Sequence, residues 1–265
     1  MNKIGAILTV YNKSPASEFK KCLKSLFSQT YPYDEIIVVV DGPIGRELHG
    51  ILNEFASKEC FKIYWLKENL GPGAARNAGI SACSMDYVSI YDADDSYSYD
   101  RNKLTIIALE QFPDVDVIGF YQTEKIIGVG EILKKVPHQN YLIKKGLKFK
   151  STINNTTATI RRSKVLGVGG YPVMRYGEDF ILWIRMARSG SKFLNMPYSV
   201  ADVNLDLDRR SGGYGVLKRQ MVFVFTLLKE YRFMNVYAYV RGVSYIVMWL
   251  MPTTIRQFLF KKTRS

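Results

Sequence analysis

The sequence predicts an α/β fold in which a mostly parallel sheet is flanked by helices. Apolar, β-branched runs of strand length alternate with segments whose apolar residues repeat at helical spacing, an order that implies βαβ crossovers. The chain has 265 residues, of which 47% are hydrophobic and 23% charged. It can therefore bury a sizeable core, and overall disorder is excluded. We expect one large domain as the body of the protein.

The alternation is clearest in the first 112 residues. Residues 4–10 form a continuous apolar run, as expected of a strand buried on both faces of a parallel sheet. In the helix that follows, Phe19, Cys22 and Leu26 lie on one apolar stripe. The remaining expected elements are strands 35–40, 61–66 and 87–91 and helices 46–57, 73–83 and 101–112. In such sheets ligands bind at the carboxyl ends of the strands, so the polar residues that follow each strand should share one rim.

Beyond residue 112 the alternation fades. Two shorter β-like pieces are expected at 115–121 and 124–129, followed by a Lys-rich loop over 134–150. No internal repeat or low-complexity segment is present. A second, differently built half is therefore appended to the first.

The charge is divided unevenly along the chain. There are 37 Lys and Arg against 24 Asp and Glu, a net charge of +13, and such an excess usually marks a polyanionic partner. Residues 209–265 hold 11 of the basic residues and one acidic residue, whereas the first 208 residues carry 26 basic and 23 acidic groups. The body is thus nearly neutral and the tail is polybasic.

The tail suits a membrane surface better than a membrane span. Residues 233–251 are mostly apolar, but Arg241 lies in the middle of this stretch and would cost about 2.5–3.5 kcal/mol on insertion. Interfacial helices with aromatic residues at the acyl boundary and basic residues among lipid headgroups fit the composition. Helices packed on the body or on a partner, and true insertion, remain as alternatives.

Cysteine and histidine usage argues against several classes of protein. Cys22, Cys60 and Cys83 are odd in number and widely spaced, which favours a reducing compartment over a disulfide framework. The apolar run at 4–10 is too short for a signal peptide, so a cytosolic protein or one attached to the cytosolic membrane face is expected. His49 and His138 belong to no plausible triad or metal cluster, which disfavours a triad hydrolase and a zinc enzyme.

Three carboxylates, those of Asp92, Asp94 and Asp95, directly follow an apolar strand. They would repel one another unless a cation lies among them, and hard oxygen ligands at this spacing suit Mg²⁺ or Mn²⁺. The alternative is a solvated turn that caps the next helix.

A glycine-containing loop at 71–77 opens the helix that follows the third strand. Its glycines permit close approach of the backbone to a ligand, and the helix N-terminus favours anions. A nicotinamide-dinucleotide motif fails here because Arg76 occupies the position of the third glycine. Arg76 could instead hold a diphosphate or nucleoside, or it could be a surface residue at a helix start.

Adjacent carboxylates open a later helix at Glu178 and Asp179. Taken alone, such residues more often interact favourably with the helix dipole than act in catalysis. If Asp179 faces the rim that holds Asp92, it could accept a proton from a hydroxyl.

Together these motifs resemble the family 2 glycosyltransferases, which act on nucleotide sugars and have the GT-A fold. The resemblance runs from about residue 4 to residue 213, and it is closest to bacterial enzymes of the amylovoran type that build O-antigen, capsule or exopolysaccharide units. These include β-1,3-glucosyl- and galactosyltransferases with an Asp-x-Asp-Asp motif. The matching segments, in family order, are 9–12, 28–31, 41–42, 71–79, 92–95, 161–163, 169–171 and 177–185.

The resemblance implies an organisation and a role for each matching position. Residues 1–215 would form the GT-A domain, with a nucleotide-binding half at 1–112 and an acceptor-binding half at 113–215, and residues 216–265 the membrane-associating tail. Nucleotide-sugar binding would fall to Thr9, Tyr11, Asp41, Arg76 and Asp92; metal binding to Asp94 and Asp95; general base catalysis to Asp179; and the acceptor side to Glu178 and Trp183. Two departures are the replacement of the frequent His-Pro-Thr by Asn155-Thr156-Thr157, and the absence of a histidine after His138.

The implied function is inverting, metal-dependent transfer of a hexose from UDP-Glc or UDP-Gal. The acceptor would be GlcNAc or GalNAc on undecaprenyl diphosphate, at the cytoplasmic face of the inner membrane, with Mn²⁺ or Mg²⁺ as cofactor. A metal-dependent nucleotidyltransferase is the first alternative. A nucleic-acid-binding protein is the second, although the acidic cluster would repel a phosphate backbone unless a metal intervened.

Overall fold

Four parallel strands form the first half of the sheet in the order β3-β2-β1-β4. The computed structural model describes residues 2–126, 130–148, 150–174, 176–205, 222–227, 229–230, 240 and 251. Within these, β1 (Ile4–Val10), β2 (Glu35–Val40), β3 (Phe61–Trp65) and β4 (Tyr87–Asp92) match the predicted strands to within one residue. Because all four run in the same direction, the residues after them meet at one edge of the sheet.

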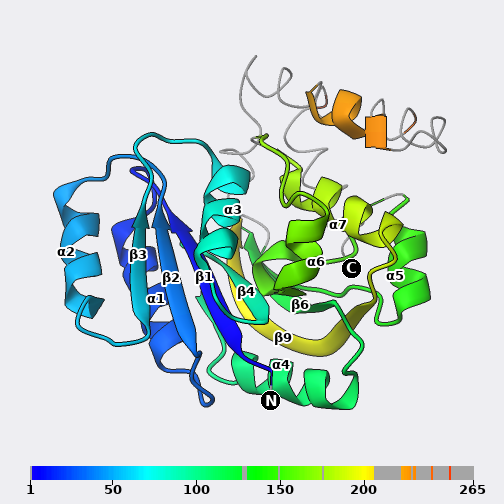
Figure 1. The fold of residues 1–265 in the computed structure, drawn as a ribbon, viewed down its shortest axis with the longest axis horizontal. Helices are drawn as coiled ribbons and strands as arrows, with labels where there is room; N and C mark the ends of the chain where they lie inside the picture. The colour runs from blue at the N-terminus through cyan, green and yellow to red at the C-terminus, as the bar shows by residue number, and fades with distance from the viewer. Residues whose placement is uncertain are drawn as a thin grey trace.

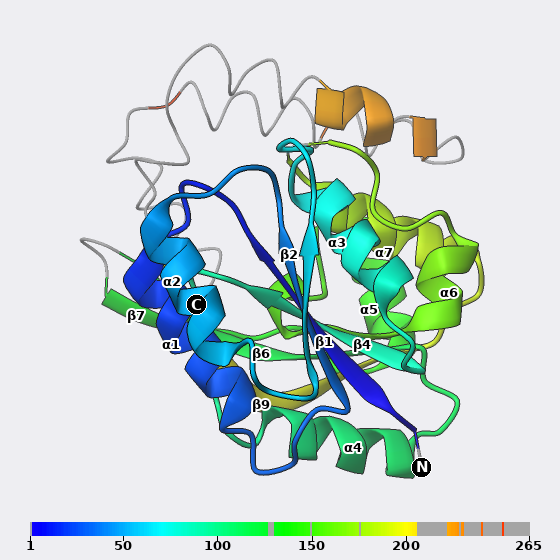
Figure 2. The same ribbon diagram turned by 60° about the vertical axis from the view of Figure 1, so that its left-hand side comes forward.

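Helices cover both faces of this half, as Figures 1 and 2 show. On one face, α1 (Ala16–Phe27) and α2 (Arg46–Phe55) pack on alternate residues of β1 and β2 such as Leu8 and Val38. On the same face α4 (Arg101–Gln111) lies against β4, where Arg101 stacks on the Tyr91 ring. On the other face, α3 (Pro72–Ala82) packs on the intervening residues, among them Ile7 and Val39. The period of two along each strand thus divides the core into two apolar clusters.

Beyond β4 the sheet becomes mixed. β8 (Thr159–Arg161) pairs antiparallel with β4, and β6 (Val117–Ile126) pairs antiparallel with β8 and parallel with β9 (Phe193–Leu205). Two short strands, β5 (Ser96–Tyr97) and β7 (Gly130–Lys134), complete the edges by antiparallel pairing with β9 and β6. The helices of this half are α5 (Asn140–Gly146), α6 (Arg162–Gly167) and α7 (Glu178–Arg188), with a 3₁₀ turn at Asn155–Thr157.

Two predictions for this half were wrong. The pieces expected at 115–121 and 124–129 are largely one strand, β6, because the polar side chains in its middle are buried and paired. Gln122 donates to Glu124 at 2.9 Å, and Lys134 lies 3.4 Å from the same carboxylate. The Lys-rich stretch expected to be a loop contains α5, which buries Ile143 and places Lys144 and Lys145 in its last turn, where basic residues favour the helix dipole.

Part of the basic tail packs on the body. Residues 222–227 and 229–230 are helical, and Phe223 and Leu227 join the apolar cluster that contains α7. No helix among the described residues is long and apolar enough to cross a bilayer. The stretch at 233–251 lies outside the described residues except for residues 240 and 251.

All three cysteines lie among the described residues, and no disulfide joins them. Cys22 and Cys83 are buried, Cys60 is half-buried, and all three are free thiols.

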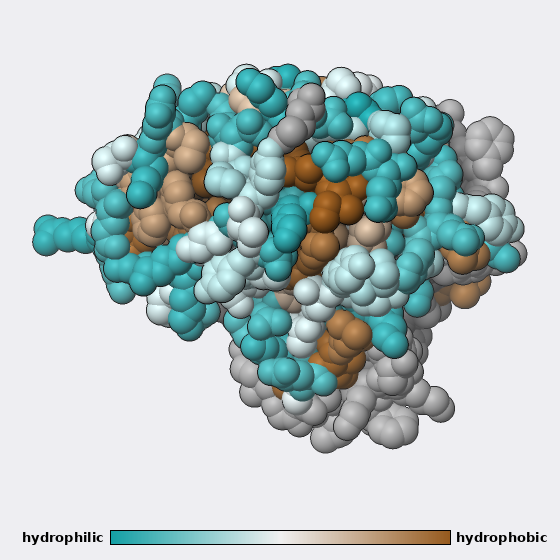
Figure 3. Space-filling view, turned by 90° about the horizontal axis from the view of Figure 1, so that it is seen from below, coloured by the Kyte–Doolittle hydropathy of each residue, from teal (hydrophilic) through white to brown (hydrophobic). Residues whose placement is uncertain are grey.

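Figure 3 shows the molecule from below, where apolar side chains gather in a few patches bordered by polar ones. A cavity of about 300 Å³ beside α4 is lined by Asn2, Ile106, Leu109 and Glu110. No feature of this cavity indicates a ligand.

Candidate active site

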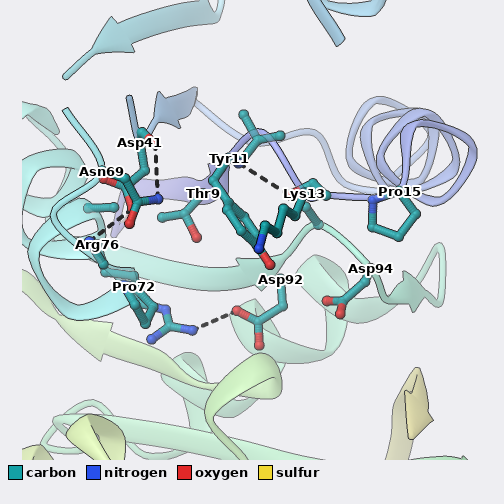
Figure 4. A pocket seen from close by; sticks show the side chains of 15 residues that line it. Thr9, Tyr11, Lys13, Pro15, Asp41, Asn69, Pro72, Arg76, Asp92 and Asp94 are labelled. Atoms are coloured by element: carbon teal, nitrogen blue, oxygen red, sulfur yellow. Dashed lines mark hydrogen bonds and ion pairs between the residues drawn. The ribbon is translucent and has the colours of Figure 1, made fainter. Parts of the chain in front are cut away.

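A cavity of about 320 Å³ opens at the carboxyl ends of β1, β2 and β4. Figure 4 shows the side chains around it, with Tyr11 and Lys13 pointing toward Asp92 and Asp94. The lining residues come from segments far apart in the sequence: Thr9, Val10, Tyr11, Lys13, Ser14, Pro15, Asp41, Asn69, Gly71, Pro72, Ala75, Arg76, Asp92, Ala93 and Asp94. The predicted rim of polar residues therefore exists, and it encloses a volume suited to a small ligand.

Asp41 fixes the loop in front of α3. Its carboxylate accepts the backbone N–H of Leu70 at 2.7 Å and that of Gly71 at 3.0 Å. Gly71 has a φ of 93°, which only glycine adopts without strain. The loop that follows β3 is thereby held against the end of β2, with α3 starting at the cavity wall.

Arg76 joins two carboxylates that come from different halves of the chain. Its Nη2 lies 2.8 Å from Asp92 Oδ1 and its Nη1 lies 2.8 Å from Glu178 Oε1, and the side chain is only 8% exposed. Burial lowers the pKa of Arg76, but the two carboxylates outweigh it and the pKa lies well above its usual value. The alternative of a surface arginine at a helix start is wrong, since Arg76 is the buried link between α3, β4 and α7.

The carboxylates that begin α7 lie beside this link. Burial raises the pKa of Glu178, an effect that the Arg76 charge opposes and the neighbouring Asp179 charge reinforces. Asp179 is half-buried and does not line the cavity. Burial, with the nearby charges of Asp179 and Asp92, raises the pKa of Tyr171 above its usual range despite Arg76. The first turn of α7 therefore adjoins the rim that holds Asp92, to which Arg76 joins Glu178. The use of Asp179 as a base stays a prediction.

The three carboxylates after β4 point in different directions. Asp94 is exposed and lines the cavity, whereas Asp95 is buried and accepts a hydrogen bond from Thr156 Oγ1 at 2.8 Å. Tyr97 Oη contacts Thr156 Oγ1 and accepts the backbone N–H of Asp92 at 2.8 Å. Thr156, in the segment 155–157 that departs from the family pattern, thus holds the turn at residues 92–95 through Asp95 and Tyr97.

The donor set fits a divalent cation that shares its shell with a phosphate. Among the residues that the structure describes, no three His, Cys, Asp or Glu side chains are grouped to hold a metal ion. Asp92 and Asp94 both line the cavity, although Arg76 occupies one oxygen of Asp92. Mg²⁺ in proteins is commonly held by one or two carboxylates together with substrate phosphates, which is the number available here.

Sequence comparison decides the family. The model of glycosyl transferase family 2 matches residues 6–168. This chain belongs to glycosyl transferase family 2. It is 31% identical over 98% of both chains to the amylovoran biosynthesis glycosyltransferase AmsE of Erwinia amylovora. It is 25% identical, over 98% of this chain and 96% of the relative, to an Escherichia coli protein named UDP-Gal:alpha-D-GlcNAc-diphosphoundecaprenol beta-1,3-galactosyltransferase. The prediction of a glycosyltransferase is thus confirmed over its two alternatives.

Solved structures confirm the predicted GT-A-type fold. S. aureus TarS 1–349 in complex with UDP-GlcNAc superposes with a TM-score of 0.65 at 18% identity, covering 85% of this chain and 66% of that chain. A second structure of TarS 1–349 gives a TM-score of 0.63 at 17% identity, covering 85% of this chain and 65% of that chain. At this identity the likeness concerns the fold alone.

Two side chains of this family 2 enzyme differ from what its sequence indicated. Trp183 was expected to line the acceptor side, but it is fully buried in the core beside Phe180 and Ile184, so we assign it to packing. It was misjudged because position in a motif does not show which face of α7 a residue occupies. Lys13 was not among the expected residues, yet it lines the cavity. Its place three residues after β1, at the end of a buried parallel strand, is the signal that could have identified it.

Proposed function

We propose that the enzyme transfers a hexose, with inversion, from UDP-Glc or UDP-Gal to GlcNAc or GalNAc on a polyprenyl diphosphate. The observation that carries this proposal is the cavity at the strand ends, where Lys13 and Arg76 lie opposite Asp92 and Asp94. Support comes from the E. coli relative, whose name gives a UDP-Gal donor and a GlcNAc-diphosphoundecaprenol acceptor, and from AmsE, whose name places it in amylovoran biosynthesis.

The donor would bind along the ends of β1 and β2. Tyr11 is 41% exposed at the cavity, so its ring is free to stack on a uracil base, while Thr9 and Asp41 border the same space. Each Asp41 oxygen already accepts one backbone N–H and keeps a second lone pair for the base. Lys13 supplies a positive charge on the diphosphate side, since it extends toward Asp92 and Asp94.

Mn²⁺ or Mg²⁺ would be held by Asp94 and the outer oxygen of Asp92. Asp95 supports this turn through Thr156 and does not reach the cavity itself. When bound, such a cation offsets the negative charge that accumulates on a departing diphosphate. Arg76 keeps the Asp92 carboxylate in place through its ion pair, so the orientation of this ligand depends on a buried contact.

Proton removal is assigned to Asp179 at the start of α7. The acceptor hydroxyl gives its proton to the Asp179 carboxylate, its oxygen forms a bond to the anomeric carbon, and the bond from that carbon to the UDP oxygen breaks. Attack from the side opposite the diphosphate inverts the anomeric centre. Glu178 forms an ion pair with Arg76 and therefore does not act as the base. Asp179 is then the carboxylate at the start of α7 that can accept the proton of the acceptor hydroxyl.

The lipid-linked acceptor would be met at the cytoplasmic face of the membrane. The excess of basic residues in the segment 209–265 favours contact with anionic lipid, because each basic residue near such a surface contributes about 1 kcal/mol. In this arrangement the enzyme is peripheral, and the tail brings the cavity to the leaflet that holds the diphosphate-linked sugar.

The deciding experiment is a donor screen with a GlcNAc- or GalNAc-diphosphate-lipid analogue and Mn²⁺ or Mg²⁺, in which release of UDP and formation of the glycosylated lipid are measured. Asp94→Ala should abolish transfer and metal-dependent UDP binding. Asp179→Ala should abolish transfer and leave UDP binding at the wild-type level. Substantial turnover by Asp179→Ala would remove the base assignment, and release of pyrophosphate in place of UDP would contradict sugar transfer.

A further inference from the structure

One apolar stripe of the helical residues 222–227 and 229–230 faces α7 (Figure 1, orange). Phe223 is 4% exposed and Leu227, one turn later, is 1% exposed. Glu230 follows at the same helical face, and its carboxylate contacts the other end of α7. We call these residues the docking segment.

The ring of Phe223 lies directly over the glycine that precedes α7. A Cβ placed on Gly177 would come within 2.4 Å of two ring atoms of Phe223, so the contact leaves no space for a side chain. Gly177 has a φ of 71°, in the left-handed region. The ring also packs edge-on against Tyr176, with 5.6 Å between the ring centroids, and at a tilt against Phe180, with 6.1 Å between centroids.

The far end of the docking segment is held by charge. Arg185 Nε donates to Glu230 Oε1 at 2.7 Å, and Arg188 Nη1 donates to the Glu230 carboxylate at 3.1 Å and to its backbone oxygen at 2.8 Å. The Glu230 side chain is 15% exposed, so these ion pairs are partly shielded from solvent. Two anchors, at the beginning and the end of α7, therefore fix the direction of the segment.

The first of these anchors adjoins the two carboxylates of the site. Gly177 is bonded directly to Glu178, and its backbone angles set the direction in which the first turn of α7 leaves the loop. Arg76 holds Glu178. Among the described residues, no side-chain hydrogen bond or ion pair holds Asp179, so its direction is determined by this backbone turn.

We propose that Phe223 is a positioning residue that keeps the Gly177 turn in place, so that Asp179 faces the sugar-transfer site. The inference rests on the proposed function in its use of Asp179 as the base. It also gives the tail a second role besides contact with lipid, because the same chain segment closes over the start of α7.

Hydrogen exchange provides the first test, with the full-length protein and no substrate. Phe223→Ala should raise the exchange of the amides at 176–181, while Phe225→Ala should leave it at the wild-type rate because Phe225 is 65% exposed. Phe223→Leu retains an apolar side chain over Gly177 and should stay close to wild type. Unchanged exchange in Phe223→Ala would overturn the proposal.

Kinetics provide the second test. Phe223→Ala should lower kcat for transfer by on the order of 10- to 100-fold, the loss typical of a displaced catalytic group, with the KM for UDP-sugar within about twofold of wild type. Phe223→Leu should recover most of kcat. Equal losses in donor affinity and kcat would show a general structural role and overturn the proposal.

A milder variant keeps the test decisive if Phe223→Ala does not fold. Glu230→Gln removes the charged anchor without leaving a cavity, so it should raise the exchange of 176–181 and lower kcat by about 2- to 5-fold, again with donor KM unchanged. Wild-type behaviour in both measurements would contradict the proposal. If the wild-type enzyme transfers sugar to no lipid-linked acceptor, the proposed function fails, and the exchange comparison still decides the positioning role.

Discussion

At the scale of single residues, Arg76 determines the geometry of the site. It is the group through which β4, which carries Asp92, and α7, which carries Glu178, are connected. A buried arginine between two carboxylates is costly to desolvate, and removal of one member leaves the others uncompensated. The pair of ion contacts therefore stabilises the relative placement of the two halves.

Replacement of Arg76 tests this connection. Arg76→Ala should lower the free energy of unfolding by about 3–5 kcal/mol, because two carboxylates then face each other without a cation. Arg76→Lys keeps the charge but loses the forked geometry of the guanidinium, so its free energy of unfolding should lie between those of Arg76→Ala and the wild type. Urea denaturation measures both, and a loss below about 1 kcal/mol in Arg76→Ala would contradict the role given to this residue.

A second residue, Glu35, gives the stability a dependence on pH. Burial alone would raise the pKa of Glu35, but bonds from Lys62 Nζ at 2.5 Å and from the Ser84 N–H at 3.0 Å outweigh it, and the pKa lies below its usual 4.5. With a lowered folded-state pKa, this carboxylate contributes stability above pH 4.5 and loses it as the pH falls through the folded-state value.

The comparison of wild type with Glu35→Gln isolates this contribution. The wild type should exceed the variant in unfolding free energy most clearly above about pH 5, and the difference should shrink as the pH is lowered below 4.5. Denaturant midpoints at several pH values measure it. A difference that grows toward acid pH would mean that the folded-state pKa is raised instead.

The residues of the site were predictable to different degrees. Tyr11 and Asp41 directly follow parallel strands and Asp92 ends one, and topology alone brings such positions to one edge. Thr9, inside β1, was expected only from the resemblance to the family. The side-chain directions were not predictable, since the inward turn of Asp95 depends on Thr156, which comes from the other half of the chain. Burial of Trp183 likewise depends on which face of α7 meets the sheet.

At the scale of elements, close approach of α3 to the sheet depends on a glycine. A Cβ on Gly79 would come within 2.6 Å of Ile7 Cγ2 and 3.0 Å of Val39 Cγ2. Gly50, on the exposed face of α2, has no heavy atom within 4 Å of the same position. The two helical glycines therefore make a matched pair.

Alanine at these positions should have opposite effects. Gly79→Ala overpacks the contact of α3 with β1 and β2, and should lower the unfolding free energy by about 1–3 kcal/mol. Gly50→Ala adds helix propensity without a clash, and should raise it by about 0.5–1 kcal/mol. Thermal or urea unfolding of the two variants decides the matter, and an equal effect of the same sign would show that the clash at Gly79 is relieved by movement of the helix.

The elements were predictable where their apolar pattern is local. Every strand and helix up to residue 112 was expected, apart from the short β5, because buried strands and amphipathic helices leave their period in the sequence. β6 and α5 were misjudged because tertiary contacts override composition there. The buried pair Gln122 and Glu124 suits a strand only when Lys134 lies next to it, and α5 is anchored through the burial of Ile143.

At the scale of the whole molecule, the tail combines attachment to the body with a large positive charge. Its docking segment packs on α7. No local sequence pattern indicates this packing, because Phe223 and Gly177 are far apart in the sequence and come into contact only in the folded chain. Residues 232–265 carry six basic residues and no acidic ones. Basic residues thus lie on both sides of the docking segment, and six of the 11 in the tail follow it.

Truncation after residue 231 keeps the docking segment and removes six of the 11 basic residues of the tail. Full-length protein should sediment with vesicles that contain anionic lipid, and the shortened protein should bind them much more weakly while it retains UDP binding. Raising the salt concentration should weaken the full-length complex, as expected for contacts between basic residues and lipid headgroups. Equal sedimentation of the two proteins would locate the lipid contact before residue 232, in the body or among the five basic residues of 209–231.

The burial of the cysteines makes the protein convenient to label. The Cys22 thiol is fully buried, and burial raises the pKa of Cys83 to about 12, so neither forms an accessible thiolate at neutral pH. Cys60, just before β3, is the partly accessible thiol of the three. A maleimide dye would therefore attach to the native enzyme at one defined point on the edge of the sheet, without any engineered substitution, and would report on membrane binding by its fluorescence.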